Sequence, residues 1–251
     1  ISEENDILIS AVTTTADFAL DADGTGNITV DSLNVGANQA TLNAAGWIRD
    51  NGDATSDIAA TDLRLVAVTG IGDTVATNML ETTVTNLAAY TDSGDIQIAN
   101  TGALTITTID TTAGAVIDDA LAGGDDSGLD SISITAASPL TVATAVVNND
   151  GGDILLAALG SAATDDVTLN ANVTATGGDG SITIYAGDSI AQALGTVSAV
   201  GTGTITLAAG EDWTDTAVDQ DGNAAGSITQ ADGTLISSVN GKITLDAAGS
   251  I

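Results

Sequence analysis

The stretch "GSITIYAGDSI", residues 180–190, holds the pattern that decides the fold. The aliphatic residues Ile182 and Ile184 alternate with hydroxyl-bearing residues, between a glycine and a Gly-Asp pair. Strict alternation over four to six residues, bounded by Gly and Asp, predicts a half-buried β-strand. Nearly the same phrase returns as "GTITLAAGEDW" at 203–213 and "GKITLDAAGSI" at 241–251, which indicates an internal repeat.

The pattern recurs along the whole chain. Its paired positions occur at eleven places: Ile7/Ile9, Ile28/Val30, Leu63/Leu65, Ile96/Ile98, Ile132/Ile134, Ile154/Leu156, Val167/Leu169, Ile182/Ile184, Ile205/Leu207, Ile228/Gln230 and Ile243/Leu245. The strands that start at 28, 63, 96, 132, 167, 205 and 243 recur at intervals of about 33–38 residues, and the copies at 154, 182 and 228 fall between them. This spacing predicts an all-β protein with one parallel β-solenoid domain over residues 1–251, less regular over 1–90 and clearer over 91–251. The expected repeat is about 33–38 residues with two or three strands, and whether it forms one rung or two stays open.

The glycine and the acid in the phrase predict tight corners between strands. Glycine is expected to open each strand because a corner needs unusual backbone angles. Asp and Asn cap turns and tolerate the left-handed conformation. Rungs stacked about 4.8 Å apart place Ile on Ile and Thr on Thr, which explains why one chain repeats the same strand.

Composition excludes several other folds and partners. The only aromatic residues are Phe18, Trp47, Tyr90, Tyr185 and Trp213, too few for an aromatic-anchored sandwich or propeller. The 34 acidic and three basic residues give a net charge of −31, which repels nucleic acid and anionic lipid. No apolar run reaches the length of roughly 18 residues that a membrane-spanning helix needs. The charge attracts cations and suits a saline or calcium-containing exterior, although acid also serves solubility alone.

Few residues are equipped for catalysis. The chain has no His and no Cys, which excludes a Ser-His-Asp triad and zinc sites built on those residues. Adjacent acids at 118–119, 125–126, 165–166 and 211–212 are candidates for polysaccharide cleavage, which needs two carboxylates at a fixed separation. Three basic residues and two Trp are poor equipment for holding a sugar, so acids in solvated turns are the simpler interpretation. We therefore expect no enzyme and no catalytic residue.

Calcium is the cofactor that the side chains suit best. It takes six to eight oxygen ligands, and Asp-x-Asp-Gly supplies carboxylates at alternate positions of a tight turn. The segments "DADGTGN", "GGDDSGLD" and "DQDGN" offer the candidate ligands Asp21, Asp23, Asn27, Asp125, Asp126, Asp130, Asp219, Asp221 and Asn223. Neither Asp-x-Asp-Gly match completes an EF-hand, and "GGDGSITIY" at 177–185 does not fit the RTX nonapeptide, because Ile182 stands where its aspartate belongs. Each segment also fits a plain Asx turn, and both interpretations stay open.

The stretches "GDIQIANTGALTITTIDTTAG" at 94–114, "GSITIYAGDSIAQALGTVSA" at 180–199 and "GKITLDAAGSI" resemble a known family. They are similar to the glycine-rich strand repeats of filamentous-haemagglutinin-like adhesins and autotransporter passengers, which are large bacterial surface proteins. The resemblance is one of composition and rhythm, and it covers most of the chain. It implies a right-handed parallel β-helix and an extracellular or cell-surface bacterial protein with a structural or adhesive role. It implies no catalytic residues.

These expectations combine into a non-catalytic extracellular β-solenoid, the shaft or building block of a bacterial surface fibre, matrix or adhesin. Neither the first nor the last strand phrase carries a capping pattern, so we expect a piece of a longer protein or a subunit that self-associates through its solenoid ends. Surface glycans or a cell-surface receptor are the other expected partners. Two alternatives remain. One is a polysaccharide-binding or polysaccharide-cleaving β-helix module with acids aligned beside Trp47 or Trp213, and the other is a calcium-dependent surface-layer protein.

Overall fold

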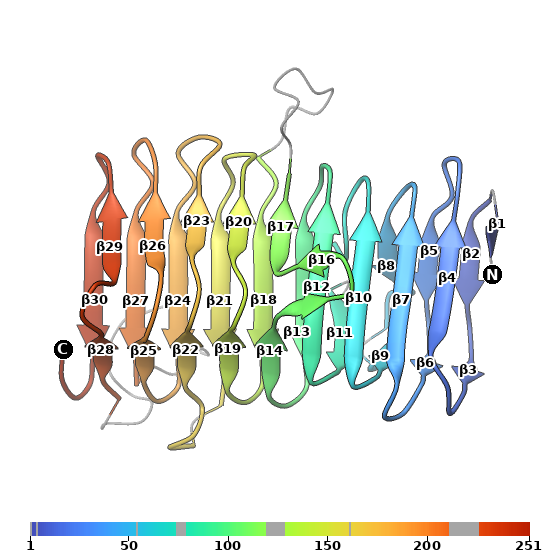
Figure 1. The fold of residues 1–251 in the computed structure, drawn as a ribbon, viewed down its shortest axis with the longest axis horizontal. Coiled ribbons are helices and arrows are strands. Elements are labelled where there is room, and N and C mark those ends of the chain that lie inside the picture. The colour runs from blue at the N-terminus through green and yellow to red at the C-terminus, as the bar shows by residue number, and fades with distance from the viewer. Residues whose placement is uncertain are drawn as a thin grey trace.

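The chain forms a coil of β-strands in which each turn pairs in parallel with its neighbours (Figure 1). The computed structural model describes residues 2–3, 5–53, 55–73, 79–118, 129–160, 162–210 and 226–251. Strands on the near face of Figure 1 run upward and those on the far face run downward as the chain advances from the N- to the C-terminus. The coil is therefore right-handed, as parallel crossovers nearly always are. The predicted parallel β-solenoid is confirmed.

The far face is built on strands that begin with isoleucine. They are β2 (Ile7–Ile9), β5 (Ile28–Val30), β8 (Ile48–Asp50), β13 (Ile96–Asn100), β18 (Ile132–Ala136), β21 (Ile154–Ala158), β24 (Ile182–Ala186), β27 (Ile205–Ala209) and β30 (Ile243–Ala247). Their first residues pair in register, and Ile71 bridges Ile48 to Ile96. In the described part of the chain this makes a column of ten isoleucines, buried in every coil but the first and the last. At about 4.8 Å per rung the column is roughly 43 Å long.

In the first four coils the far face bends after this column and continues in a second short strand. These strands are β3 (Val12–Thr13), β6 (Leu33–Asn34), β9 (Ile58–Ala59) and β11 (Leu80–Thr83). The strand β11 pairs with β13, which is long enough to cover both parts of the face. From β13 onward the far face is one unbroken strand per coil, because the bend has been absorbed.

The near face changes in the opposite sense. It begins as single strands, β1 (Ser2–Glu3), β4 (Phe18–Ala22), β7 (Gln39–Ala44), β10 (Asp62–Ala67) and β12 (Asn86–Thr91). It then divides, because β12 pairs with both β14 and β17. One branch is β14 (Leu104–Ile106), β19 (Leu140–Val142), β22 (Val167–Leu169), β25 (Ile190–Gln192) and β28 (Ile228–Gln230); the other is β17 (Ala115–Ile117), β20 (Val146–Asn148), β23 (Val173–Ala175), β26 (Thr196–Ala199) and β29 (Leu235–Ser238). Aliphatic side chains from both faces alternate inward and fill the core.

A small antiparallel hairpin covers the near face where it divides. Its strands β15 (Thr108–Ile109) and β16 (Thr112–Ala113) fold back across β12 and β10 (Figure 1). Ile109 is buried there, and the Arg64 guanidinium donates from Nε to the Thr112 hydroxyl at 2.8 Å. At the tip of the hairpin, Asp110 accepts a hydrogen bond from the Gln39 amide at 2.6 Å. The hairpin thus ties three coils together from outside.

The length of one coil differs from the predicted repeat. Successive isoleucines of the column are roughly 20–28 residues apart, as in other solenoids with short repeats, except for two longer intervals that include positions 119–128 and 211–225. The predicted interval of about 33–38 residues is wrong as a coil length because it mixes strands of different faces. Leu63 and Val167 lie on the near face, whereas the other starting residues of that series belong to the isoleucine column. Each coil in fact carries three short strands or strand segments.

The residue before most of the column's isoleucines ties its coil to the next one. Asp153 Oδ1 accepts from the backbone N–H of Ser181 at 2.8 Å, and Ser181 Oγ accepts from that of Thr204 at 3.1 Å. The same contact joins four other pairs along the column: Asp6 to Asn27, Asn27 to Trp47, Asp95 to Ser131 and Ser131 to Asp153. Short polar side chains suit this contact because longer ones would overshoot a donor only one rung away. The position is held instead by Trp47, Gly70 and Lys242 in three of the coils.

Most of the glycines that open the strands serve close approach rather than unusual backbone angles. Gly152, Gly180 and Gly203 stand two residues before their isoleucines, and none of them has a positive φ. A Cβ added at Gly180 would run into the carbonyl oxygen of Gly152, and one at Gly203 into that of Gly180. The predicted role is therefore wrong for these positions. It holds for Gly94, whose φ is 82°.

Candidate metal centre

The bend of the far face carries longer connections in two successive coils. In the first two coils, residues 10–11 and 31–32 suffice to join the two strands of the face. In the third coil, residues 51–57 separate β8 from β9, and in the fourth, residues 72–79 separate Ile71 from β11. The two insertions fall at the same place in the coil.

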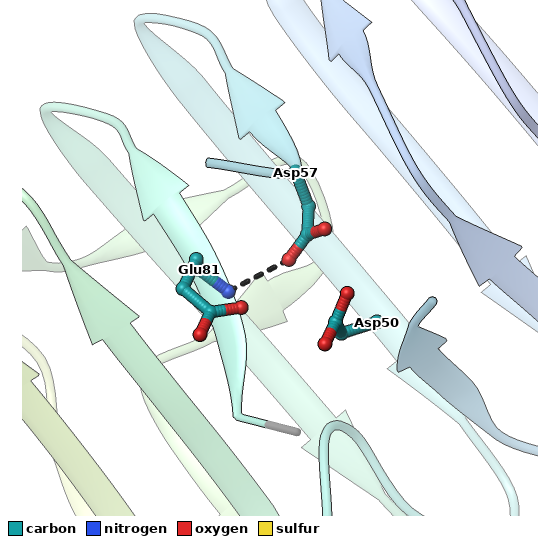
Figure 2. A group of neighbouring side chains, drawn as sticks. All are labelled: Asp50, Asp57 and Glu81. Atoms are coloured by element: carbon teal, nitrogen blue, oxygen red, sulfur yellow. Dashed lines mark hydrogen bonds between the residues drawn. The ribbon is translucent and has the colours of Figure 1, made fainter. Parts of the chain in front are cut away.

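Three carboxylates, those of Asp50, Asp57 and Glu81, meet at this bend and point toward a common space (Figure 2). Asp50 ends β8 and pairs with Val30, which pairs with Ile9, so an acid takes an inward position that is apolar in the first two coils. Asp57 lies just before β9, and its Oδ2 accepts from the backbone N–H of Glu81 at 2.8 Å. One oxygen from each of the three carboxylates lies within 4.8 Å of the others.

The triad is buried and poorly satisfied. Asp50 is 7 % exposed and Asp57 is 0 % exposed, while Glu81 is half-buried. Both oxygens of Asp50, Oδ1 of Asp57 and Oε2 of Glu81 are buried and accept no hydrogen bond within the part of the chain that the structure describes. An ionised carboxylate buried without a partner costs several kcal/mol, so this arrangement requires a proton or a cation.

The electrostatics of the triad favour uptake of positive charge. Burial raises the pKa of Asp57 to about 9; the backbone hydrogen bond from Glu81 opposes this, and the charges of Asp50 and Glu81 add to it. Burial and the charge of Asp50 also raise the pKa of the Glu81 carboxyl. Without a cation, the folded protein therefore holds a proton on Asp57 at neutral pH.

No basic side chain forms an ion pair with the triad among the residues of the described ranges. Arg49 is next to Asp50 in β8 but occupies the opposite face of the strand, since successive side chains alternate. Its guanidinium lies over the Trp47 ring, 4.6 Å from the centroid. Arg64 is on the near face, where NH1 donates to Asn43 at 2.8 Å. Within the described chain, the three carboxylates thus lack a basic side chain as counter-charge.

In the first predicted calcium segment, Asp21 and Asn27 make hydrogen bonds within the protein. Asp21 in β4 accepts a hydrogen bond from the side-chain amide of Asn43. The Asn27 amide donates to Asp6 Oδ1 at 2.8 Å and accepts from the backbone N–H of Trp47 at 3.0 Å. All three contacts connect neighbouring coils. A calcium ion bound here would have to compete with them, and the site stays a prediction.

Two of the other predicted calcium ligands, Asp23 and Asp130, lie within the described residues. Asp23 is exposed in the same turn. Asp130 is buried, and its Oδ2 accepts from the backbone N–H of Gly94 at 2.6 Å, which makes it another link between coils. Five predicted ligands lie outside the described residues: Asp125, Asp126, Asp219, Asp221 and Asn223.

The acid pairs considered for polysaccharide cleavage also contact the backbone or neighbouring coils. Asp165 Oδ2 accepts from the backbone N–H of Ala162 at 2.7 Å, and Asp166 Oδ1 accepts from that of Ser189 at 3.0 Å. Asp118 Oδ1 accepts from the Asn149 amide at 3.3 Å. The Asp165 contact lies within one turn, and the other two join neighbouring coils. The remaining members of the pairs lie outside the described residues: Asp119, Asp125, Asp126, Glu211 and Asp212.

Sequence reasoning missed the triad, although one signal for it exists. The segment "GWIRD" at 46–50 follows the strand phrase but places Asp50 where the second aliphatic residue belongs. An acid at an inward position of a repeat marks a local exception to the core. Asp57 and Glu81 give no such signal, because their proximity depends on how the third and fourth coils stack.

Comparison with known proteins adds no functional assignment. Among the described residues, none forms a helix long and apolar enough to cross a membrane. The chain matches no protein-family model, no curated protein and no solved structure, so its function has to be inferred from its own geometry and chemistry.

Proposed function

We propose that this chain is a non-catalytic structural β-solenoid, the shaft or building block of an extracellular bacterial fibre, matrix or adhesin. The observation that carries the proposal is the register of the isoleucine column, which continues through ten coils of the described chain. Each interior coil is hydrogen-bonded to the coils on both sides, and bending the rod would break those bonds along one face. The net charge of −31 and the resemblance to bacterial surface repeats support an extracellular setting.

The last described coil supports self-association through the solenoid ends. Within the described chain, β29 and β30 each pair on one side only, and unpaired strand edges are templates for further strands. The outer edge of β28 is partly covered, because the backbone N–H of Ile228 donates to the carbonyl oxygen of Ser250 at 2.8 Å. Ile243 is 41 % exposed there, although its counterparts in the eight coils between the first and the last are fully buried. A hollow at this end of the solenoid is lined by Ile228, Ile236, Leu245 and Ile251 together with Thr229, Gln230 and Ser250. A second copy whose first coil docks on this edge would extend the isoleucine column through Ile7.

The test is the assembly state of the purified chain. Electron microscopy and sedimentation over a range of concentrations should show rods that lengthen by end-to-end addition. The substitution Ile243→Lys places a charge in the docking edge and should leave single short rods. Leu194→Lys adds the same charge at an exposed position of an interior coil and should assemble like the parent. Single rods of one length for all three proteins at high concentration would contradict self-association.

A further inference from the structure

We propose that Asp50, Asp57 and Glu81 form a binding site for one hard divalent cation, which joins the third and fourth coils at the bend of the far face. The site is separate from the segments in which the sequence predicts calcium. The inference does not depend on the proposed structural function, since a cation at this position would stabilise the fold whatever the rod does.

The first support is a buried side chain that lacks a partner and points into the cluster. Asp50 is 7 % exposed, and neither of its carboxylate oxygens accepts a hydrogen bond from the described residues. In the preceding coil, Val30 occupies the equivalent inward position, so an aliphatic residue would fit at position 50. A buried polar group normally finds a partner. The cluster therefore lacks a positively charged component.

The second support is the distance between the carboxylates. Two oxygens bound to the same calcium ion at about 2.4 Å are at most about 4.8 Å apart. The oxygens offered by Asp50, Asp57 and Glu81 meet this limit for every pair. Calcium, magnesium and manganese prefer carboxylate oxygens as ligands, whereas softer metals prefer nitrogen or sulfur. The chain has no His or Cys that would favour a softer ion.

The third support is the position of the site between coils. Asp50 and Asp57 bracket the insertion of the third coil, and Glu81 follows the insertion of the fourth. Two hydrogen bonds of 2.8 Å already join the two coils here, from the Glu81 N–H to Asp57 Oδ2 and from the Asp57 N–H to the Glu81 carbonyl oxygen. A cation bound to all three carboxylates would add a direct link across the bend and offset the repulsion among them.

The experiment compares cation binding and thermal unfolding in the purified chain after removal of metal with a chelator. High NaCl screens the many exposed acids, so a response that survives it comes from a specific site. Calorimetric titration with CaCl₂, MgCl₂ and MnCl₂ should show one saturable site for at least one of these ions. At about 100 times its Kd, that ion should raise the Tm by roughly 5–10 °C. The ion with the largest shift identifies the preferred metal.

Three variants locate the response. Asp50→Asn should abolish the saturable site and the Tm shift, and without metal it should be at least as stable as the parent because a buried unpaired charge is gone. Glu81→Gln, at a half-buried position, should weaken binding and provides a second test if Asp50→Asn does not fold. Asp232→Asn removes an exposed acid in the turn between β28 and β29 and should respond like the parent. The proposal is overturned if the parent shows no saturable site, or if Asp50→Asn and Glu81→Gln keep the full response.

Discussion

At the residue scale, the same acidic side chain has opposite consequences depending on the donor it meets. Asp153 precedes its isoleucine and faces a backbone N–H of the next coil, so its charge is used in a hydrogen bond between rungs. Asp50 ends a strand of the same face and faces two other carboxylates instead. The first arrangement gives the carboxylate a hydrogen-bond donor, and the second leaves it beside other carboxylates without one. The many acids of this chain are therefore not equivalent.

The raised pKa of Asp57 predicts that metal-free protein loses stability as the pH rises. Between the ordinary pKa of 3.8 and the folded value of about 9, the folded state holds a proton that the unfolded state has released. The unfolding free energy then falls with pH, by up to about 1.4 kcal/mol per pH unit from this one group. Below 3.8 both states are protonated and above about 9 both are ionised, so the contribution is confined to that window. Urea unfolding from pH 5 to 9 in chelator measures the slope.

The control for this slope is Asp57→Asn, which cannot titrate. The charges that face Asp57 are those of Asp50 and Glu81, and Asp53 also acts on Glu81. They remain in the variant, as does the general repulsion among the surface acids. The stability of Asp57→Asn relative to the parent should therefore increase steadily with pH. Parallel curves for the two proteins would show that Asp57 does not hold the proton.

At the element scale, the glycine of the strand phrase is required by the distance between coils. Gly180→Ala would drive a Cβ into the carbonyl oxygen of Gly152, and the nearest atoms, from Gly151 and Gly152, are all backbone and cannot move aside as a flexible side chain could. We expect a loss of about 1–3 kcal/mol in unfolding free energy, as for other overpacked sites. Gly178→Ala is the matched control, because its nearest neighbour would be 3.3 Å away and its φ is not positive. Chemical denaturation of both variants should separate them, and equal losses would show that the close approach is not what selects glycine.

The alternating sequence pattern predicts the strands, but it predicts neither the coil length nor the triad. Alternation such as that of 182–186 reports which face of a strand is buried, and it does so on every face of the solenoid. Leu63 on the near face and Ile96 on the far face therefore look alike in the sequence, and counting both lengthened the predicted repeat. The triad depends on how the third and fourth coils stack, and no local pattern records that alignment.

At the scale of the whole molecule, net charge opposes the assembly that the open edge favours. Each copy carries a net charge of −31, so two copies repel one another along their whole length as their ends approach. The proposed contact at this edge would be backbone-mediated and largely apolar, around the exposed Ile243, so salt should not weaken it. Screening shortens the range of the repulsion from about 10 Å at 0.1 M salt to about 3 Å at 1 M.

End-to-end association should therefore strengthen as NaCl is raised. Sedimentation of the parent chain at fixed protein concentration should show a mean rod length that grows between about 0.05 and about 1 M NaCl. Ile243→Lys should stay a single rod at every salt concentration, because the docking edge itself carries the new charge. The comparison uses a monovalent salt in the presence of chelator, so that a cation at the Asp50 triad does not contribute. Rods that shorten as NaCl rises would mean that charged contacts, and not the apolar edge, hold the copies together.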